Sequence, residues 1–392
     1  MLSAFAKARK SLVRTGLAIA ALALAACVPS GPRTSGGPTL NAGAPVAVAL
    51  LVPGGSGQAS DELLARSLQN AAQLAIADLG GVEIDLRVYN TAGQPGQAQA
   101  MALQAAEEGA QIILGPVFAQ EANAAGVAVA SQGINVLSFS NNPDIAGGNV
   151  FVLGPTFVNT AERLASYAVR NGKGRIMAVH DRNQAGNVGR AAIEKGVRAA
   201  GGSLVAVGDY EFSQNGVVAA APGIVQAARS NGADAIFLTA DTAGALPLVT
   251  QLLMENGLDP EVTRFIGLTR WDIPSATLAL PGVQGGWFAL PDPGLYAQFQ
   301  SRYQAAFGEA PHPIAGLAYD GIAAIGALAK QGKSDALTAS ALTQNSGFAG
   351  VNGVFRLRSD GTNERGLAVA QIRNNQVVVV DPAPRSFSGA GF

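Results

Sequence analysis

The sequence is short of the residues on which most metal sites and many catalytic sites depend. It has 1 cysteine and 2 histidines among 392 residues, which excludes a disulfide framework and a cysteine-cluster metal site. Charged residues make up only 14%, and 26 basic side chains nearly balance 27 acidic ones. Without a surplus of positive charge the chain is not expected to bind nucleic acid. Hydrophobic residues, in contrast, make up 48%, which is typical of a folded protein, and the length favours two domains.

The first residues have the pattern of an export signal. Basic residues precede Gly16–Ala26, an apolar stretch that is too short to span a bilayer as a helix. The motif Leu24-Ala25-Ala26-Cys27 resembles the lipobox of bacterial lipoproteins, which implies cleavage after residue 26 and acylation of Cys27. Val28, rather than an aspartate, follows the cysteine, and in lipoprotein sorting this implies the outer membrane. An ordinary signal peptide with an incidental cysteine is the alternative.

Two segments have too few large apolar side chains to form a core. Residues 27–45 are rich in glycine and proline and are expected to be a flexible tether that follows the acylated cysteine. Residues 381–392 are expected to be a loose tail. The folded body is therefore expected between residues 46 and 380.

In this body, strands and helices alternate. Apolar runs of strand length, such as Val46–Val52 and Ile134–Phe139, are separated by segments with helical spacing, such as Asp61–Leu79. Continuous apolar strands that alternate with helices predict a parallel sheet covered on both faces. The pattern restarts near Phe151, so we expect a second unit of the same kind.

The second unit contains Pro222–Asn231, a segment that we expect to be a helix beginning with its proline. Three later strands, Gly353–Leu357, Ala368–Arg373 and Gln376–Val380, are joined by turns and predict antiparallel hairpins at an edge. The predicted fold class is therefore α/β, with two doubly wound Rossmann-like lobes.

Five short motifs carry a resemblance to a known family. They are Val48–Pro53, Ile112–Pro116, Asn135–Ser140, Asp181–Gly186 and Gly350–Phe355. In their order they resemble the type I periplasmic-binding-protein fold, in the branch that includes leucine-binding proteins. The resemblance implies two lobes joined by three crossing strands, with a ligand cleft between them.

Lobe boundaries follow from the same resemblance. The first lobe is expected to comprise about residues 46–153 and 284–348, and the second about residues 154–283 and 349–380.

The sequence departs from the amino-acid-binding pattern where those proteins hold a zwitterion. They usually carry serine or threonine after the third strand, where this chain has Val117-Phe118. They usually carry tyrosine where this chain has Ala185, and often an acid where it has Thr269–Trp271. Because a buried charge without a partner is costly, a leucine-like ligand is not expected.

A second group is also similar to this chain. The opening strand, the turn Gly115-Pro116 and the strand Asn135–Leu137 resemble penicillin-binding protein activators, which are outer-membrane lipoproteins with a leucine-binding-like domain. The resemblance implies a non-catalytic regulator of peptidoglycan synthesis, anchored in the periplasm, whose partner is a peptidoglycan synthase. The alternative is the substrate-binding component of an ABC importer for an amino acid, amide or similar small polar solute, with a permease as partner. Neither function needs a cofactor.

Candidate ligand residues follow the predicted strands. Ser138, Ser140 and Asn141 offer hydroxyl and amide groups at the end of one strand, although a turn with satisfied backbone is the alternative. Asp181 opens one of the motifs that resemble the family. Asp241 ends another strand, where helix capping is the alternative to a cleft contact.

Three further candidates come from the second half of the chain. Arg270 and Trp271 together suit an anionic sugar-type ligand or a protein hot spot, and an ion pair between Arg270 and Asp272 is the alternative. Tyr319 lies on a predicted helix in a region that the resemblance implies lines the hinge. A structural hydrogen bond is equally expected there.

An enzyme would need residues that this chain does not supply. Two histidines, His180 and His312, could act as catalytic bases, but the sequence has no recognisable nucleophile motif such as a Gly-x-Ser-x-Gly elbow for them to activate. The glycine-rich turn Gly54–Gly57 departs from the dinucleotide fingerprint, since Ser60 stands at the last glycine position and Tyr89-Asn90 ends the second strand. We therefore predict a binding protein rather than an enzyme.

Overall fold

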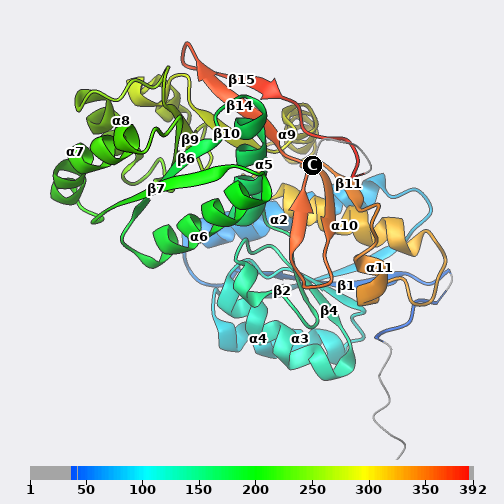
Figure 1. Cartoon of the computed structure of the whole chain (residues 1–392). Helices are drawn as coiled ribbons and strands as arrows, with labels where there is room; N and C mark the ends of the chain where they lie inside the picture. The colour runs from blue at the N-terminus through cyan, green and yellow to red at the C-terminus, as the bar shows by residue number, and fades with distance from the viewer. Residues whose placement is uncertain (1–36, 42, 388–392) are drawn as a thin grey trace, which may run out of the picture. The chain divides into compact units, whose positions relative to one another are not determined.

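The computed structural model describes residues 37–41 and 43–387 (Figure 1). Cys27, its lipobox and most of the predicted tether lie outside the described residues, so the lipoprotein prediction remains a prediction. Among the residues that are described, no helix has the length and hydrophobicity that a membrane span requires.

The first sheet of the described chain has five parallel strands in the order β2-β1-β3-β4-β5. Their bounds are β1 (Val46–Val52), β2 (Ile84–Asn90), β3 (Ile112–Leu114), β4 (Asn135–Ser138) and β5 (Val150–Val152). One face packs against α2 (Ala59–Asp78), α9 (Pro293–Phe307) and α10 (Gly316–Ala329), with α11 (Ala339–Leu342) nearby. The other face packs against α3 (Pro95–Glu107) and α4 (Ala119–Val129).

The second sheet of the described chain has seven strands in the order β15-β14-β10-β9-β8-β6-β7. Its parallel strands are β6 (Arg175–Asp181), β7 (Ser203–Tyr210), β8 (Ala235–Leu238), β9 (Arg264–Gly267) and β10 (Trp287–Leu290). The hairpin of β14 (Ala368–Arg373) and β15 (Gln376–Asp381) adds the antiparallel edge (Figure 1). Helices α5 (Phe157–Arg170) and α6 (Gln184–Ala199) cover one face, and α7 (Gln214–Ser230) and α8 (Leu246–Glu255) the other.

A small antiparallel sheet completes the fold. It consists of β11 (Phe348–Gly350), β12 (Gly353–Leu357) and β13 (Asn363–Arg365). The side chains of Phe348, Phe355 and Leu357 pack into the core of the first lobe. The predicted α/β class with two lobes and the antiparallel strands near the end are thus confirmed.

One predicted helix start is wrong. Helix α7 begins at Gln214, and Pro222 lies inside it instead of opening it. The hydroxyl of Ser213 accepts a hydrogen bond from the Gly216 amide and caps the helix. The apolar spacing continues across the proline, with Val217 buried on the same face, so packing outweighs the hydrogen bond that proline removes.

Within residues 43–387 the chain passes between the two lobes three times. The crossings lie at 153–156, between β5 and α5, at 291–292, between β10 and α9, and at 366–367, between β13 and β14. The second and third crossings differ from the boundaries expected after residues 283 and 348, because β10 belongs to the seven-stranded sheet and β12 packs on the first lobe. Local hydrophobicity identifies β10 as a strand, but its sheet is decided by pairing with β9 and β14.

Candidate functional site

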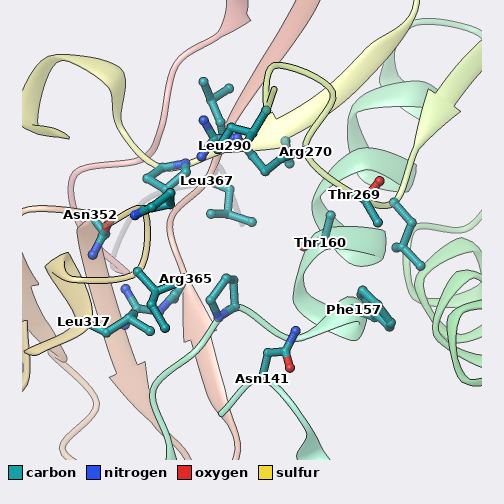
Figure 2. A pocket seen from close by; sticks show the side chains of 17 residues that line it. Asn141, Phe157, Thr160, Thr269, Arg270, Leu290, Leu317, Asn352, Arg365 and Leu367 are labelled. Atoms are coloured by element: carbon teal, nitrogen blue, oxygen red, sulfur yellow. The ribbon is translucent and has the colours of Figure 1, made fainter. Parts of the chain in front are cut away.

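A cavity of ≈ 300 Å³ lies where the chain crosses between the lobes (Figure 2). All three crossings line it, through Pro155 in the first, Pro291 in the second and Leu367 in the third. Thr269, after β9, lines it from the second lobe, and Ile314, before α10, lines it from the first. We call it the interlobe cavity, and any molecule inside it would contact both lobes.

The lining of the interlobe cavity is mostly apolar. Phe157, Leu290 and Leu317 are among the side chains that form its walls (Figure 2). No acidic residue is among the described residues that line it. The polar members of the lining are Asn141, Thr160, Thr269, Arg270, Asn352 and Arg365.

Arg365 is held in a buried ion pair at the edge of this cavity. Its side chain is 3% exposed and that of Asp320 is 0% exposed, and the Nη1 group donates to Asp320 Oδ2 at 2.9 Å. The Nε group donates to the carbonyl of Leu153 at 2.6 Å, and the guanidinium carbon lies 4.8 Å from the ring centroid of Phe355. Arg365 therefore ties the first crossing to α10 and to the small sheet.

Asp320 is satisfied by several donors besides the arginine. The amide of Val351 donates to Oδ1 at 2.8 Å, and Asn352 Nδ2 donates to Oδ2 at 3.0 Å. On the other lobe, Asn159 of α5 exchanges two hydrogen bonds with the backbone of Arg365. These contacts form a polar network that holds the third crossing in place, and we call it the hinge network.

Arg270 lines the same cavity from the loop after β9. It forms a two-point ion pair with Asp272, in which Nε donates to Oδ1 at 2.6 Å and Nη2 donates to Oδ2. The arginine side chain is 31% exposed. The structure thus contains both features that the sequence predicts as alternatives, a cavity position and an ion pair with Asp272.

Asn141 is the other predicted site residue that the structure brings to the cavity (Figure 2). Ser138 and Ser140 are buried beside it, and their hydroxyls serve the backbone. The Ser138 hydroxyl donates to the carbonyl of Pro116 at 3.0 Å, and the Ser140 hydroxyl accepts from the amide of Asn142 at 3.1 Å. The turn that the sequence predicts as the alternative is therefore present.

Asp181 and Asp241 do not line the interlobe cavity. Asp181 is buried at the end of β6, where its carboxylate accepts from the side chains of Thr239 and Asn183. Asp241 is exposed, and its carbonyl accepts the amide of Leu246 at the start of α8. Both aspartates therefore accept hydrogen bonds from nearby residues of the second lobe and stabilise its local structure.

Trp271 and Tyr319 lie elsewhere. Trp271 is 0% exposed in the core of the second lobe and stacks on Phe288 at 6.5 Å between ring centroids. The hydroxyl of Tyr319 donates to Asp78, which is paired with Arg302 in a groove lined by α2, α9 and α10. Burial and the neighbouring carboxylate raise the pKa of Tyr319 to about 12. The cleft role predicted for Trp271 conflicts with its burial.

Comparison with known proteins identifies the family of this fold. A family model described as a periplasmic binding protein matches residues 45–376. The chain belongs to the periplasmic binding protein family. No curated protein matches the chain.

Solved structures share the fold of this periplasmic binding protein at low sequence identity. A Rhodospirillum rubrum protein described as a branched-chain amino acid ABC transporter is 18% identical, covers 86% of this chain and 100% of its own, and has a TM-score of 0.72. A Desulfitobacterium hafniense ABC transporter substrate-binding protein in complex with Leu is 19% identical, covers 86% of this chain and 100% of its own, and has a TM-score of 0.64. A Rhodopseudomonas palustris solute-binding protein in complex with 3,4-dihydroxybenzoic acid is 18% identical, covers 86% of this chain and 96% of its own, and has a TM-score of 0.58.

Neither histidine of this periplasmic binding protein lies in a constellation suited to metal binding. His180 Nδ1 lies 2.9 Å from the carbonyl oxygen of Asp181, and burial lowers the pKa of His312. Among the described residues, no group of three or more histidine, cysteine, aspartate or glutamate side chains could hold a metal ion.

Glu121 is a buried carboxyl group outside the cavity. It lies in the first turn of α4 and is 1% exposed. Burial raises the pKa of Glu121 above its ordinary value and outweighs the Thr91 side chain and the Phe118 backbone, which act to lower it. The charged form is therefore poorly accommodated in the folded protein.

The Glu121→Gln variant should be more stable at neutral pH by about 1–3 kcal/mol. A carboxyl whose pKa is raised by folding lowers stability as the pH rises from its unfolded pKa, about 4.3, through its folded pKa. The variant removes this loss, so its stability should depend less on pH over that window. Urea denaturation from pH 4 to pH 8 measures both effects, with the exposed Glu107→Gln as control. Equal curves for wild type and Glu121→Gln would contradict the prediction.

Proposed function

We propose that this protein is the substrate-binding component of an ABC importer and that the interlobe cavity is its solute site. The observation that carries the proposal is that residues of both lobes and all three crossings line one cavity. A solute there would interact differently with open and closed arrangements of the lobes, so its binding would shift the protein toward closure. A permease that recognises the closed arrangement would be the partner.

The solved relatives support this choice of function. Two of them hold a small molecule, one leucine and the other 3,4-dihydroxybenzoic acid. The interlobe cavity has a volume suited to molecules of that size and the mixture of apolar walls and few polar groups that small-molecule sites show.

A regulator of peptidoglycan synthesis, similar to penicillin-binding protein activators, is the second candidate. The lipobox at Cys27 favours it, since acylation followed by Val28 would anchor the protein in the outer membrane, away from an inner-membrane permease. Lipid anchoring in the periplasm is compatible with both functions. The regulator should bind a peptidoglycan synthase whether or not the cavity is occupied.

Thermal unfolding of the purified protein with pooled small solutes separates the two candidates. Binding to the folded state must raise the midpoint, and the gain is about 2.7 kcal/mol when the ligand exceeds its Kd a hundredfold. We expect one solute pool to raise the midpoint of the wild type and to have no effect on Thr160→Phe, which fills part of the cavity.

The matched control is Ser166→Phe, on the same helix α5 but outside the cavity lining, which should retain the shift. A shift that persists in Thr160→Phe would place the solute elsewhere. If no solute shifts the wild type, the importer proposal fails, and binding of a peptidoglycan synthase becomes the next measurement.

A further inference from the structure

The interlobe cavity carries a charge pattern that restricts what it can bind. Its only charged lining residues among those described are Arg270 and Arg365, which Figure 2 shows on different sides of the cavity. An ammonium group inside would meet no carboxylate in the lining, whereas a carboxylate would meet guanidinium donors. The pattern favours an anion over a zwitterion.

Arg365 has hydrogen-bonding capacity that the protein leaves unused. Its Nε and Nη1 groups donate to the Leu153 carbonyl and to Asp320, but its buried Nη2 group has no partner among the described residues. Buried donors without partners are unfavourable, and most are satisfied by protein, water or ligand. Arg365 lines the cavity, but Nη2 itself is buried, so an acceptor on a bound molecule reaches it only where neighbouring lining side chains move aside.

The neighbouring carboxylate cannot serve this free donor. Each oxygen of Asp320 already accepts two hydrogen bonds, from the backbone amides of Val351 and Asn352 at Oδ1 and from Asn352 Nδ2 and Arg365 Nη1 at Oδ2. The ion pair with Asp320 fixes the position of the guanidinium before any ligand arrives. A preorganised arginine of this kind is suited to a carboxylate.

We propose that the cavity binds a small organic acid with an apolar body and no ammonium group, and that Arg365 is the principal anchor of its carboxylate. This inference rests on the proposed solute-binding function and names the class of solute. The apolar body would pack against walls such as Phe157, Leu290 and Leu317. Arg270, on another side of the cavity, would contribute a second cationic contact.

Two sets of matched compounds test the class of solute on the unaltered protein. The first set is 4-methylpentanoate, leucine and 3-methylbutylamine, which share one apolar body. The second is 3-phenylpropanoate, phenylalanine and 2-phenylethylamine. Calorimetric titration should show that the acid of at least one set binds at least tenfold more tightly than its zwitterion, and that the amines do not bind.

The possible outcomes separate this inference from the proposed function. If leucine or phenylalanine binds as tightly as its matched acid, the inference fails and solute binding stands. If a neutral solute binds and no acid does, the inference fails in the same way. If neither these compounds nor the solute pools bind, the proposed function fails together with the inference.

Substitution of Arg365 tests the anchor itself. Arg365→Lys keeps a positive charge beside Asp320 but removes the Nη2 group, so affinity for the acid should fall at least tenfold. Arg302→Lys is the matched control, because Arg302 pairs with Asp78 in a groove away from the cavity. A folded Arg365→Lys with unchanged affinity would overturn the assignment of the anchor.

A second variant tests the solute contact without altering the hinge network, so that a folding defect there cannot be mistaken for a loss of binding. Arg270→Lys removes the two-point pair with Asp272 at a half-buried position, and it should weaken binding of the acid severalfold while leaving the midpoint of the free protein nearly unchanged. Equal affinities in wild type, Arg270→Lys and a folded double variant Asp320→Asn/Arg365→Gln would show that neither arginine contacts the solute.

Discussion

Asp320→Ala is expected to lower the free energy of unfolding by about 3–5 kcal/mol. The substitution leaves the guanidinium of Arg365 buried and without its counter-charge, and it also frees the donors of Val351 and Asn352. Buried charges are costly when one partner is removed, even where the intact pair adds little to stability. Urea denaturation followed by circular dichroism measures the loss.

Glu309→Ala is a suitable control, because Glu309 forms an exposed ion pair with Arg66 on the first lobe. Exposed pairs contribute little, so this variant should unfold almost like the wild type. The double variant Asp320→Leu/Arg365→Met should recover part of the stability lost in Asp320→Ala, since it leaves no unpaired charge, while the donors of Val351 and Asn352 stay without their acceptor. If Asp320→Ala unfolds like Glu309→Ala, the hinge network has no special role in stability.

The hinge network links stability to the solute site. Arg365 contacts the first crossing at Leu153, helix α10 through Asp320, and α5 through Asn159. The same side chain lines the interlobe cavity. A ligand that satisfies its free Nη2 group would therefore act on the residues that hold the two lobes together. The double variant above should be more stable than Asp320→Ala but unable to bind an organic acid, which separates the two roles of Arg365.

The sequence predicts the fold class well because apolar periodicity is a local property. Ile112–Leu114 and the other central strands are continuous apolar runs, and their alternation with helices predicts two parallel sheets before any contact is known. Pairing is not local. The assignment of Trp287–Leu290 to the second sheet depends on β9 and β14, and β14 lies far along the chain.

The candidate site is predicted less completely, for a physical reason. Asp320 and Arg365 are 45 residues apart in sequence, on a helix and a strand that only the folded chain brings together. Neither position carries a motif. Arg270 could be recognised because a charged residue beside a tryptophan in a loop is unusual, but the same pattern does not tell which neighbour faces the cavity. Arg270 lines the cavity, whereas Trp271 turns into the core.

Because Trp271 lies in the core, Trp271→Ala is the second substitution that we expect to destabilise the protein strongly. The indole is 0% exposed and stacks on Phe288. Its removal should lower the free energy of unfolding by about 3–5 kcal/mol, as measured by urea denaturation, because the space it leaves cannot fully collapse. Trp271→Phe should cost less, since it retains a ring and loses an indole N–H that has no partner among the described residues. Affinity for the organic acid should also fall in Trp271→Ala, because the loop that carries Arg270 loses its buried contact.

A coupled variant tests the packing explanation directly. A methyl group on Gly267 would lie 2.2 Å from the Trp271 ring, so Gly267→Ala alone should destabilise the protein by about 1–3 kcal/mol through overpacking. In the Trp271→Ala background the clash is gone and the added methyl group occupies vacated space, so Gly267→Ala should be neutral or stabilising there. If the losses of stability in the two single variants simply add in the double variant, the Trp271 ring does not fill the space beside Gly267. The measured coupling thus reports whether Trp271 is a packing residue of the second lobe rather than the ligand contact that its sequence context predicts.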